Sequence, residues 1–97
     1  MRNRVYISGG ITNVPNYKEN FARAEKKLKD LGLEVINPVA MEESLPNLSY
    51  EEYMKLDMCY LSICNVIYLL KGWEKSCGAN REYGYALAKG YKVMKEF

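Results

Sequence analysis

The segment NVIYLL, residues 65–70, most constrains the fold of this chain, because it is an almost continuous apolar run with the length of one strand. A strand that is apolar at nearly every position is covered on both faces of its sheet. The β-rich runs RVYIS at 4–8 and LEVIN at 33–37 precede it, and YKVM at 91–94 follows it. Helical segments separate these runs, so the sequence predicts a parallel sheet between two layers of helices.

Three helices are predicted between the strands, over residues 17–31, from residue 49 to about 64, and from about 79 to 89. In the first, apolar residues recur at spacings of three and four, with Asn16 placed as N-cap and Gly32 just beyond the end. We therefore expect a single α/β domain over the whole chain. The expected architecture is a three-layer Rossmann-like or flavodoxin-like fold with about four parallel strands and three helices.

The second helix has the clearest start signal, because Ser49 and Glu52 form a capping-box pattern. Asp57 lies off the centre of its predicted apolar stripe and is the only acid in the run LDMCYLSIC. The expected stripe consists of Tyr53, Leu56, Tyr60 and Ile63.

Ligands of such folds bind outside the carboxyl ends of the strands, so three loops are expected to meet there, at 8–16, 38–49 and 71–80. Within the second loop, residues 39–48 show no clear periodicity and include Glu42 and Glu43. This segment is interpreted as an excursion at the carboxyl edge of the sheet and a candidate lid.

Charge and hydropathy exclude two classes of partner. Fourteen basic and twelve acidic residues are mixed along the chain, giving a net charge of +2 and no basic stripe for a nucleic-acid polymer. The longest apolar segment, CYLSICNVIYLL, is interrupted by Ser62 and Asn65 and predicts neither a signal peptide nor a membrane span.

The chemistry open to the chain is limited by its lack of histidine. The three cysteines show no CxxC spacing, so no zinc site is expected, and reduced thiols in the cytoplasm are the preferred interpretation. Without histidine there is no Ser-His or Cys-His triad. Acid-base chemistry must come from carboxylates, tyrosines, lysines or cysteines, and we expect neither a metal nor a cofactor.

Two glycines directly follow the first strand, in the segment Ser8, Gly9, Gly10, Ile11. Bare backbone amides at this position can approach a phosphate or a ribose. The segment lacks the full dinucleotide fingerprint and the Lys-Ser/Thr of a P-loop. A tight turn that requires positive φ explains the glycines equally well.

Glu82 is a lone acid among small residues near the start of the third helix, in SCGANREYGYA. In the first turn, the helix dipole stabilises a carboxylate by about 0.3–1 kcal/mol, so a purely structural role is open. The small residues around it, Gly78 and Gly84 among them, suit either close approach of a ligand or tight packing of helix on sheet. If Asp57 faces the same edge, two carboxylates converge in a way that suits glycosyl chemistry.

Three further side chains have alternative roles. The hydroxyl of Ser76, in a loop before a helix, suits either an anion or a helix cap. Tyr6 and Trp73 are the aromatics considered for stacking on a base, with core packing as the other role for Tyr6.

Taken together, VYISGGI, KLDMCYL, CNVIYLL and GANREYGYA resemble the nucleoside 2-deoxyribosyltransferase superfamily, including its 2′-deoxynucleoside 5′-monophosphate N-glycosidase branch. The most specific element is Gly-x-x-x-Glu-x-Gly-x-Ala, which Gly78, Glu82, Gly84 and Ala86 satisfy. The likeness covers nearly the whole chain and is greatest to a short branch found in bacteria and their phages. It implies that Glu82 attacks the anomeric carbon of the deoxyribose and that Asp57 protonates or orients the leaving base.

The resemblance also implies how the substrate is held. Ser8 to Ile11 would lie against the nucleoside or its phosphate, and Gly78 would give the backbone room. Transferases carry an acid two residues before the motif glycine, whereas this chain has Ser76, which resembles the monophosphate hydrolases and favours a nucleotide substrate. A homodimer or larger assembly with shared pockets is implied as well.

The leading hypothesis is therefore an N-glycosidase or deoxyribosyltransferase-like enzyme acting on a 2′-deoxynucleoside 5′-monophosphate. Because a chain of 97 residues has little sequence left for a complete lid, a module that binds or sequesters a nucleotide without turnover is the alternative. A third role, in which the motif only packs helix against sheet, stays open.

Overall fold

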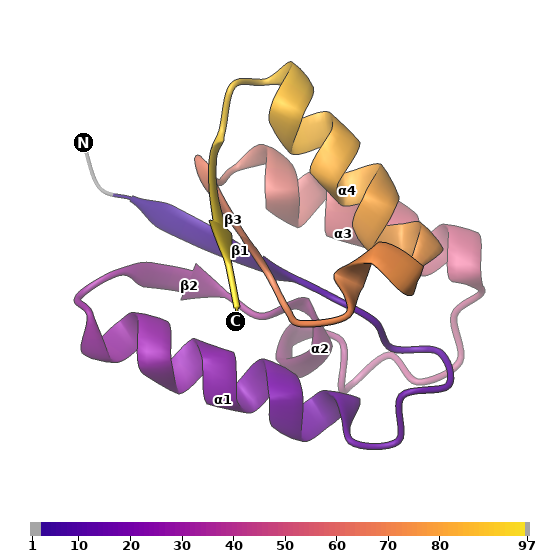
Figure 1. Ribbon diagram of the computed structural model, residues 1–97. Helices are drawn as coiled ribbons and strands as arrows, with labels where there is room; N and C mark the ends of the chain where they lie inside the picture. Colours follow the sequence, from indigo (N-terminus) through magenta and orange to yellow (C-terminus); the bar gives the residue numbers. More distant parts are fainter. Residues whose placement is uncertain (1–2, 97) are drawn as a thin grey trace.

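Four parallel strands form one sheet with helices on both faces in the computed structural model, which describes residues 3–96 (Figure 1). The strands are β1 (Arg4–Ser8), β2 (Glu34–Ile36), β3 (Val66–Leu69) and β4 (Lys92–Lys95). The helices are α1 (Tyr17–Asp30), α2 (Pro38–Met41), α3 (Tyr50–Ser62) and α4 (Cys77–Ala88), with a 3-10 helix η1 at Trp73–Lys75. The strand order β2-β1-β3-β4 follows the flavodoxin-like order, and the predicted fold class is confirmed.

Two hydrophobic cores lie on opposite faces of the sheet because side chains alternate along each strand. Val5 and Ile7 of β1 belong to the core under α1, whereas Tyr6 belongs to the core under α3 and α4. Figure 1 shows α1 on one side of the sheet and α3 and α4 on the other. Strand β3 is buried at all of its positions, as the apolar run NVIYLL predicts.

Local signals set the ends of α1 and α3. The Ser49 hydroxyl accepts a hydrogen bond from the Glu52 amide at 3.1 Å, and the Glu52 carboxylate accepts one from the Ser49 amide at 2.8 Å, so the capping box is confirmed. Gly32 follows the end of α1 with φ of +82°, a conformation that favours glycine. Asn16 is the N-cap of α1 by position, although its side chain makes no capping hydrogen bond.

The segment predicted as an irregular excursion, residues 39–48, begins inside a one-turn helix, α2, which the sequence analysis missed. Asn37 starts this helix because its side-chain oxygen accepts hydrogen bonds from the amides of Val39 and Ala40 at 3.1 and 3.2 Å. Pro38 occupies the first helical position, where its missing N–H costs nothing.

The predicted stripe of α3 is wrong by about one position. Met54, Asp57 and Leu61 are its buried residues, and Ile63, placed on the stripe, is 56% exposed. Apolar side chains occur on more than one side of this helix, so periodicity alone did not identify the packed face. Asp57 therefore lies in the middle of the buried face rather than off its centre.

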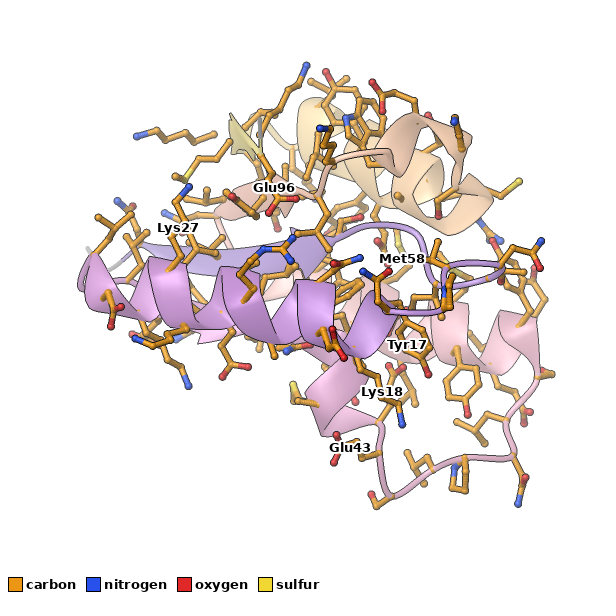
Figure 2. The ribbon with its side chains drawn as sticks, turned by 60° about the horizontal axis from the view of Figure 1, so that its bottom comes forward. Tyr17, Lys18, Lys27, Glu43, Met58 and Glu96 are labelled. Atoms are coloured by element: carbon orange, nitrogen blue, oxygen red, sulfur yellow. The ribbon has the colours of Figure 1, made fainter. Side chains whose placement is uncertain are left out.

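The end of the chain is tied back to α1. Glu96 follows β4, accepts a hydrogen bond from the Lys71 amide at 3.0 Å and pairs with Arg23 of α1 at 3.0 Å. Figure 2 shows Glu96 reaching toward α1, on the same side as Lys27. These contacts fix β4 beside β3 and leave the carboxyl edge of the sheet to the loops.

Candidate active site

Glu82 lies on the buried face of α4 and is only 5% exposed. Ala79 and Ala86, at helical spacing on the same face, are 1% and 0% exposed. Their small side chains let α4 pack close against the sheet, which carries the Glu82 carboxylate to the ends of β1 and β3. The helix begins at Cys77, two residues earlier than predicted, so Glu82 lies in the second turn. Stabilisation by the helix dipole in the first turn does not explain this acid.

Two hydroxyl groups of β1 hold the Glu82 carboxylate. Tyr6 Oη donates to Glu82 Oε2 at 2.7 Å, and Ser8 Oγ donates to Glu82 Oε1 at 2.6 Å. Because Tyr6 and Ser8 are two residues apart on one strand, both point to the face that α4 covers. Each carboxylate oxygen therefore has a fixed donor, and the orientation of the carboxylate is set before any ligand arrives.

Opposing effects determine the protonation of Glu82. Burial raises the pKa of this carboxyl from its usual 4.5 to about 7, and the charge of Asp57 adds to the rise. The hydrogen bonds from Ser8 and Tyr6 and the charge of Arg81 lower the pKa and so limit the effect of burial. A carboxylate with a pKa near neutrality can act as a nucleophile or as an acid-base group at physiological pH.

The glycines after β1 are required for space and not for backbone conformation. Neither has positive φ, so the turn interpretation is wrong. A Cβ on Gly9 would lie 2.8 Å from Leu70 side-chain atoms, and one on Gly10 would lie 3.2 Å from Val14 and 3.9 Å from Ser76. The loop after β1 thus lies directly against the start of α4, as expected for loops at the carboxyl edge of the sheet.

Ser76 caps α4, and its hydroxyl accepts a hydrogen bond from the Ala79 amide at 3.1 Å. Gly78, in the first turn, is surrounded by side chains: a Cβ there would lie 3.3 Å from Met54 Sδ and 3.7 Å from Tyr50 Oη. A Cβ on Gly84, in contrast, would meet no atom within 4 Å. The packing of this chain therefore requires a small residue at Gly78 but not at Gly84.

Asp57 is 7% exposed, and its carboxyl lies beside that of Glu42. Burial, followed by the hydrogen bond to Glu42 and the charge of Glu42, raises the pKa of Asp57 from 3.8 to about 9. Sequence reasoning missed Glu42 as a site residue. The segment after β2 carries two adjacent acids and no periodic pattern, and no sequence signal separates the inward acid from the outward one.

Comparison with known proteins places the chain in a family. Residues 3–95 match the family described as a domain of unknown function, DUF4406. The chain is a member of DUF4406. No curated protein matches the chain in sequence.

Two solved structures share the fold of this DUF4406 protein. A 2-deoxyribosyltransferase from Bacillus psychrosaccharolyticus superposes with a TM-score of 0.72 at 25% identity, covering 95% of this chain and 70% of the other. A CMP N-glycosidase from Clostridium botulinum superposes with a TM-score of 0.68 at 24% identity, covering 96% of this chain and 70% of the other. Both belong to the superfamily that the sequence motifs resemble.

The remaining predicted residues of the DUF4406 protein, Ile11 and Trp73, lie around this edge, as does Arg81 of the GANREYGYA segment. Ile11 is 41% exposed in the loop after β1. Arg81 pairs with Glu51 at 3.1 Å and lies 5.9 Å from the centre of the Tyr50 ring, so it does not point at Glu82. Trp73 packs edge-on against Tyr83, with ring centres 4.8 Å apart. Figure 2 shows Tyr17, at the start of α1, and Met58, of α3, toward this same end of the molecule.

Other kinds of site have less support in the described part of the chain. A depression of about 420 Å³, lined by Asn3, Gly32, Leu33 and Glu34, lies at the amino ends of β1 and β2, away from Glu82. Over residues 3–96, Cys, Asp and Glu side chains do not gather in threes as a metal site requires. None of the helices there has the length and apolar character needed to cross a membrane.

Proposed function

We propose that this protein cleaves the bond between base and sugar in a 2′-deoxynucleoside 5′-monophosphate, with Glu82 as the nucleophile. The observation that carries the proposal is the Glu82 carboxylate, buried at the carboxyl ends of β1 and β3 and held by Tyr6 and Ser8. The shared fold with a 2-deoxyribosyltransferase and a CMP N-glycosidase supports it. A solvated or purely capping glutamate would need neither the burial nor the two donors.

The first chemical step uses Glu82 in its ionised form. One carboxylate oxygen attacks C1′ of the deoxyribose, the C1′–N bond breaks, and its electron pair stays on the base. The base takes a proton from the Asp57 carboxyl, which the effects of burial and of Glu42 keep protonated at neutral pH. The products of this step are the free base and a deoxyribosyl ester of Glu82.

The second step regenerates the enzyme. Water attacks C1′, the ester bond to Glu82 breaks, and the proton of the water returns to Asp57. If a second base attacks in place of water, the same ester gives transfer instead of hydrolysis. The proposal favours hydrolysis because Ser76 stands where the resembled transferases carry an acid.

The start of α4 is the proposed site of the 5′-phosphate. α4 is 12 residues long, and its first amides point along the positive end of the helix dipole. The Ser76 hydroxyl accepts from Ala79 and still has its own proton to donate to a phosphate oxygen. Gly10 lies beside Ser76, which brings the loop after β1 to the same position.

Incubation of the purified protein with the four common deoxynucleoside monophosphates, followed by chromatography of the free bases, tests this function. The native protein is expected to release base, and Glu82→Gln is expected to lose about 10³-fold or more of the rate. Glu74→Gln is the matched control, because Glu74 is an exposed acid near the same loop, and it should keep the native rate.

The proposal fails if the native protein releases no base from any of the four, or if Glu82→Gln releases base at the native rate. Thermal stabilisation by a nucleotide without base release would instead identify a module that binds nucleotides without turnover.

A further inference from the structure

Glu42 and Asp57 form a carboxyl pair next to the proposed nucleophile. Asp57 lies in the middle of the buried face of α3, and Glu42 follows α2 as its C-cap. Asp57 Oδ1 and Glu42 Oε2 are both buried, and neither contacts a hydrogen-bond donor among the described residues. Two ionised carboxylates in this arrangement would repel each other and remain without donors.

A single shared proton resolves this conflict. One carboxyl then donates to the other, and the pair keeps one negative charge. The titratable groups near the pair do not neutralise that charge. Tyr6 of β1, Tyr60 of α3 and Glu82 of α4 are the groups whose pKa values the charge of Asp57 raises, and all three are acids. The buried carboxylate therefore still requires a donor, which a ligand can supply.

When a base binds, the carboxyl that holds the proton can donate it to the base instead of to its partner, so the pair offers one proton donor beside one strong acceptor. Adenine, cytosine and guanine match this arrangement, because each places a ring nitrogen that can accept a proton next to an exocyclic amino group, which in guanine is N3 beside the 2-amino group. The ring nitrogen takes the proton, and the amino group donates to the carboxylate. Thymine has neither an exocyclic amino group nor a basic ring nitrogen that could accept the proton.

We propose that Glu42 is a specificity-determining residue, which with Asp57 binds the base and selects an amino-bearing base, adenine, cytosine or guanine, over thymine. This inference rests on the proposed function, which places the sugar of the nucleotide at Glu82 and so directs the base toward Glu42 and Asp57. Glu42 is half-buried, so the pair reaches the surface at the segment after α2. The proton that the pair holds is the one transferred to the leaving base.

Binding measured by calorimetry tests the inference without requiring turnover. The ligands are the 5′-monophosphates of deoxyadenosine, deoxycytidine, deoxyguanosine and thymidine. The native protein should bind at least one of the three amino-bearing nucleotides, those of adenine, cytosine and guanine, about tenfold or more tightly than thymidine 5′-monophosphate. Glu42→Gln should reduce this preference to about threefold or less, because the amide carries no charge to attract the amino group.

Glu43→Gln is the matched control, since Glu43 is exposed and points away from the body of the protein (Figure 2). It should keep the native preference. Equal affinity of the native protein for all four nucleotides, absence of binding, or an unchanged preference in Glu42→Gln would overturn the inference. Selective binding without base release refutes only the proposed catalysis, whereas base release without preference refutes only the role of Glu42.

Discussion

Replacing Glu82 by glutamine should make the protein more stable at neutral pH while removing its proposed activity. The substitution keeps the size and shape of a side chain that is 5% exposed, so the packing of α4 on the sheet is retained. What changes is the ionisation of a buried carboxyl. When the pH is above the pKa of Glu82, the native protein buries a negative charge, whereas the variant buries a neutral amide.

The size of the effect follows from the two pKa values. Glu82 titrates near 4.5 in the unfolded chain, and burial raises its pKa to about 7 in the native state. Between these pH values the native state holds a proton that the unfolded chain has lost, so stability falls as pH rises. At about 1.4 kcal/mol for each pH unit, the full cost is about 3 kcal/mol, reached above pH 7. Glutamine does not titrate and avoids this cost.

Urea denaturation of both proteins at pH 5 and pH 8 measures the effect. The free energy of unfolding of the native protein, relative to Glu82→Gln, should fall by about 2–3 kcal/mol between these pH values. Other titrating groups, Asp57 among them, are present in both proteins and largely cancel in the difference. Glu74→Gln, at an exposed acid, should follow the native protein at both pH values. A constant difference between native and Glu82→Gln would refute the account of Glu82 as a carboxyl strained by burial.

Three further substitutions follow from the same contacts. Tyr6→Phe removes the hydroxyl that donates to Glu82 Oε2 at 2.7 Å, so the pKa of Glu82 should rise. The acid limb of a pH-rate profile for base release should then move up by about one pH unit. An unmoved limb would contradict the role of this hydroxyl. Gly9→Ala should cost about 1–3 kcal/mol in urea denaturation, because its Cβ would lie 2.8 Å from Leu70 atoms. At Gly84 a Cβ would meet nothing within 4 Å, so Gly84→Ala should instead raise the free energy of unfolding by about 0.5–1 kcal/mol. Equal effects of Gly9→Ala and Gly84→Ala would argue against close packing at Gly9.

The fold followed from the sequence because its signals are local and agree with one another. The apolar run at 65–70 predicts a strand covered on both faces, and β3 is buried throughout. Ser49 and Glu52 predict the start of α3, and both hydrogen bonds of the capping box form. The helix α4 starts two residues earlier than predicted, because Cys77 and Gly78 have low helix propensity and the cap was only one of two roles predicted for Ser76.

The site was only partly predictable, because its contacts join residues far apart in the chain. Glu82 was recognised from its small neighbours, but the hydroxyls that hold it lie 76 and 74 residues earlier, on β1. Their shared face follows from strand alternation once the sheet is known. The pairing of Glu42 with Asp57 depends on the path of the chain after β2, which no periodic pattern specifies.

The central claim is that Glu82 attacks the sugar, and mass spectrometry of acid-quenched turnover mixtures tests it most directly. With a deoxynucleotide that is cleaved, the peptide containing Glu82 should carry a deoxyribosyl phosphate bound to that side chain. Glu82→Gln should show neither the adduct nor base release. Base release by the native protein with Glu82 unmodified, together with native turnover by Glu82→Gln, would contradict the claim.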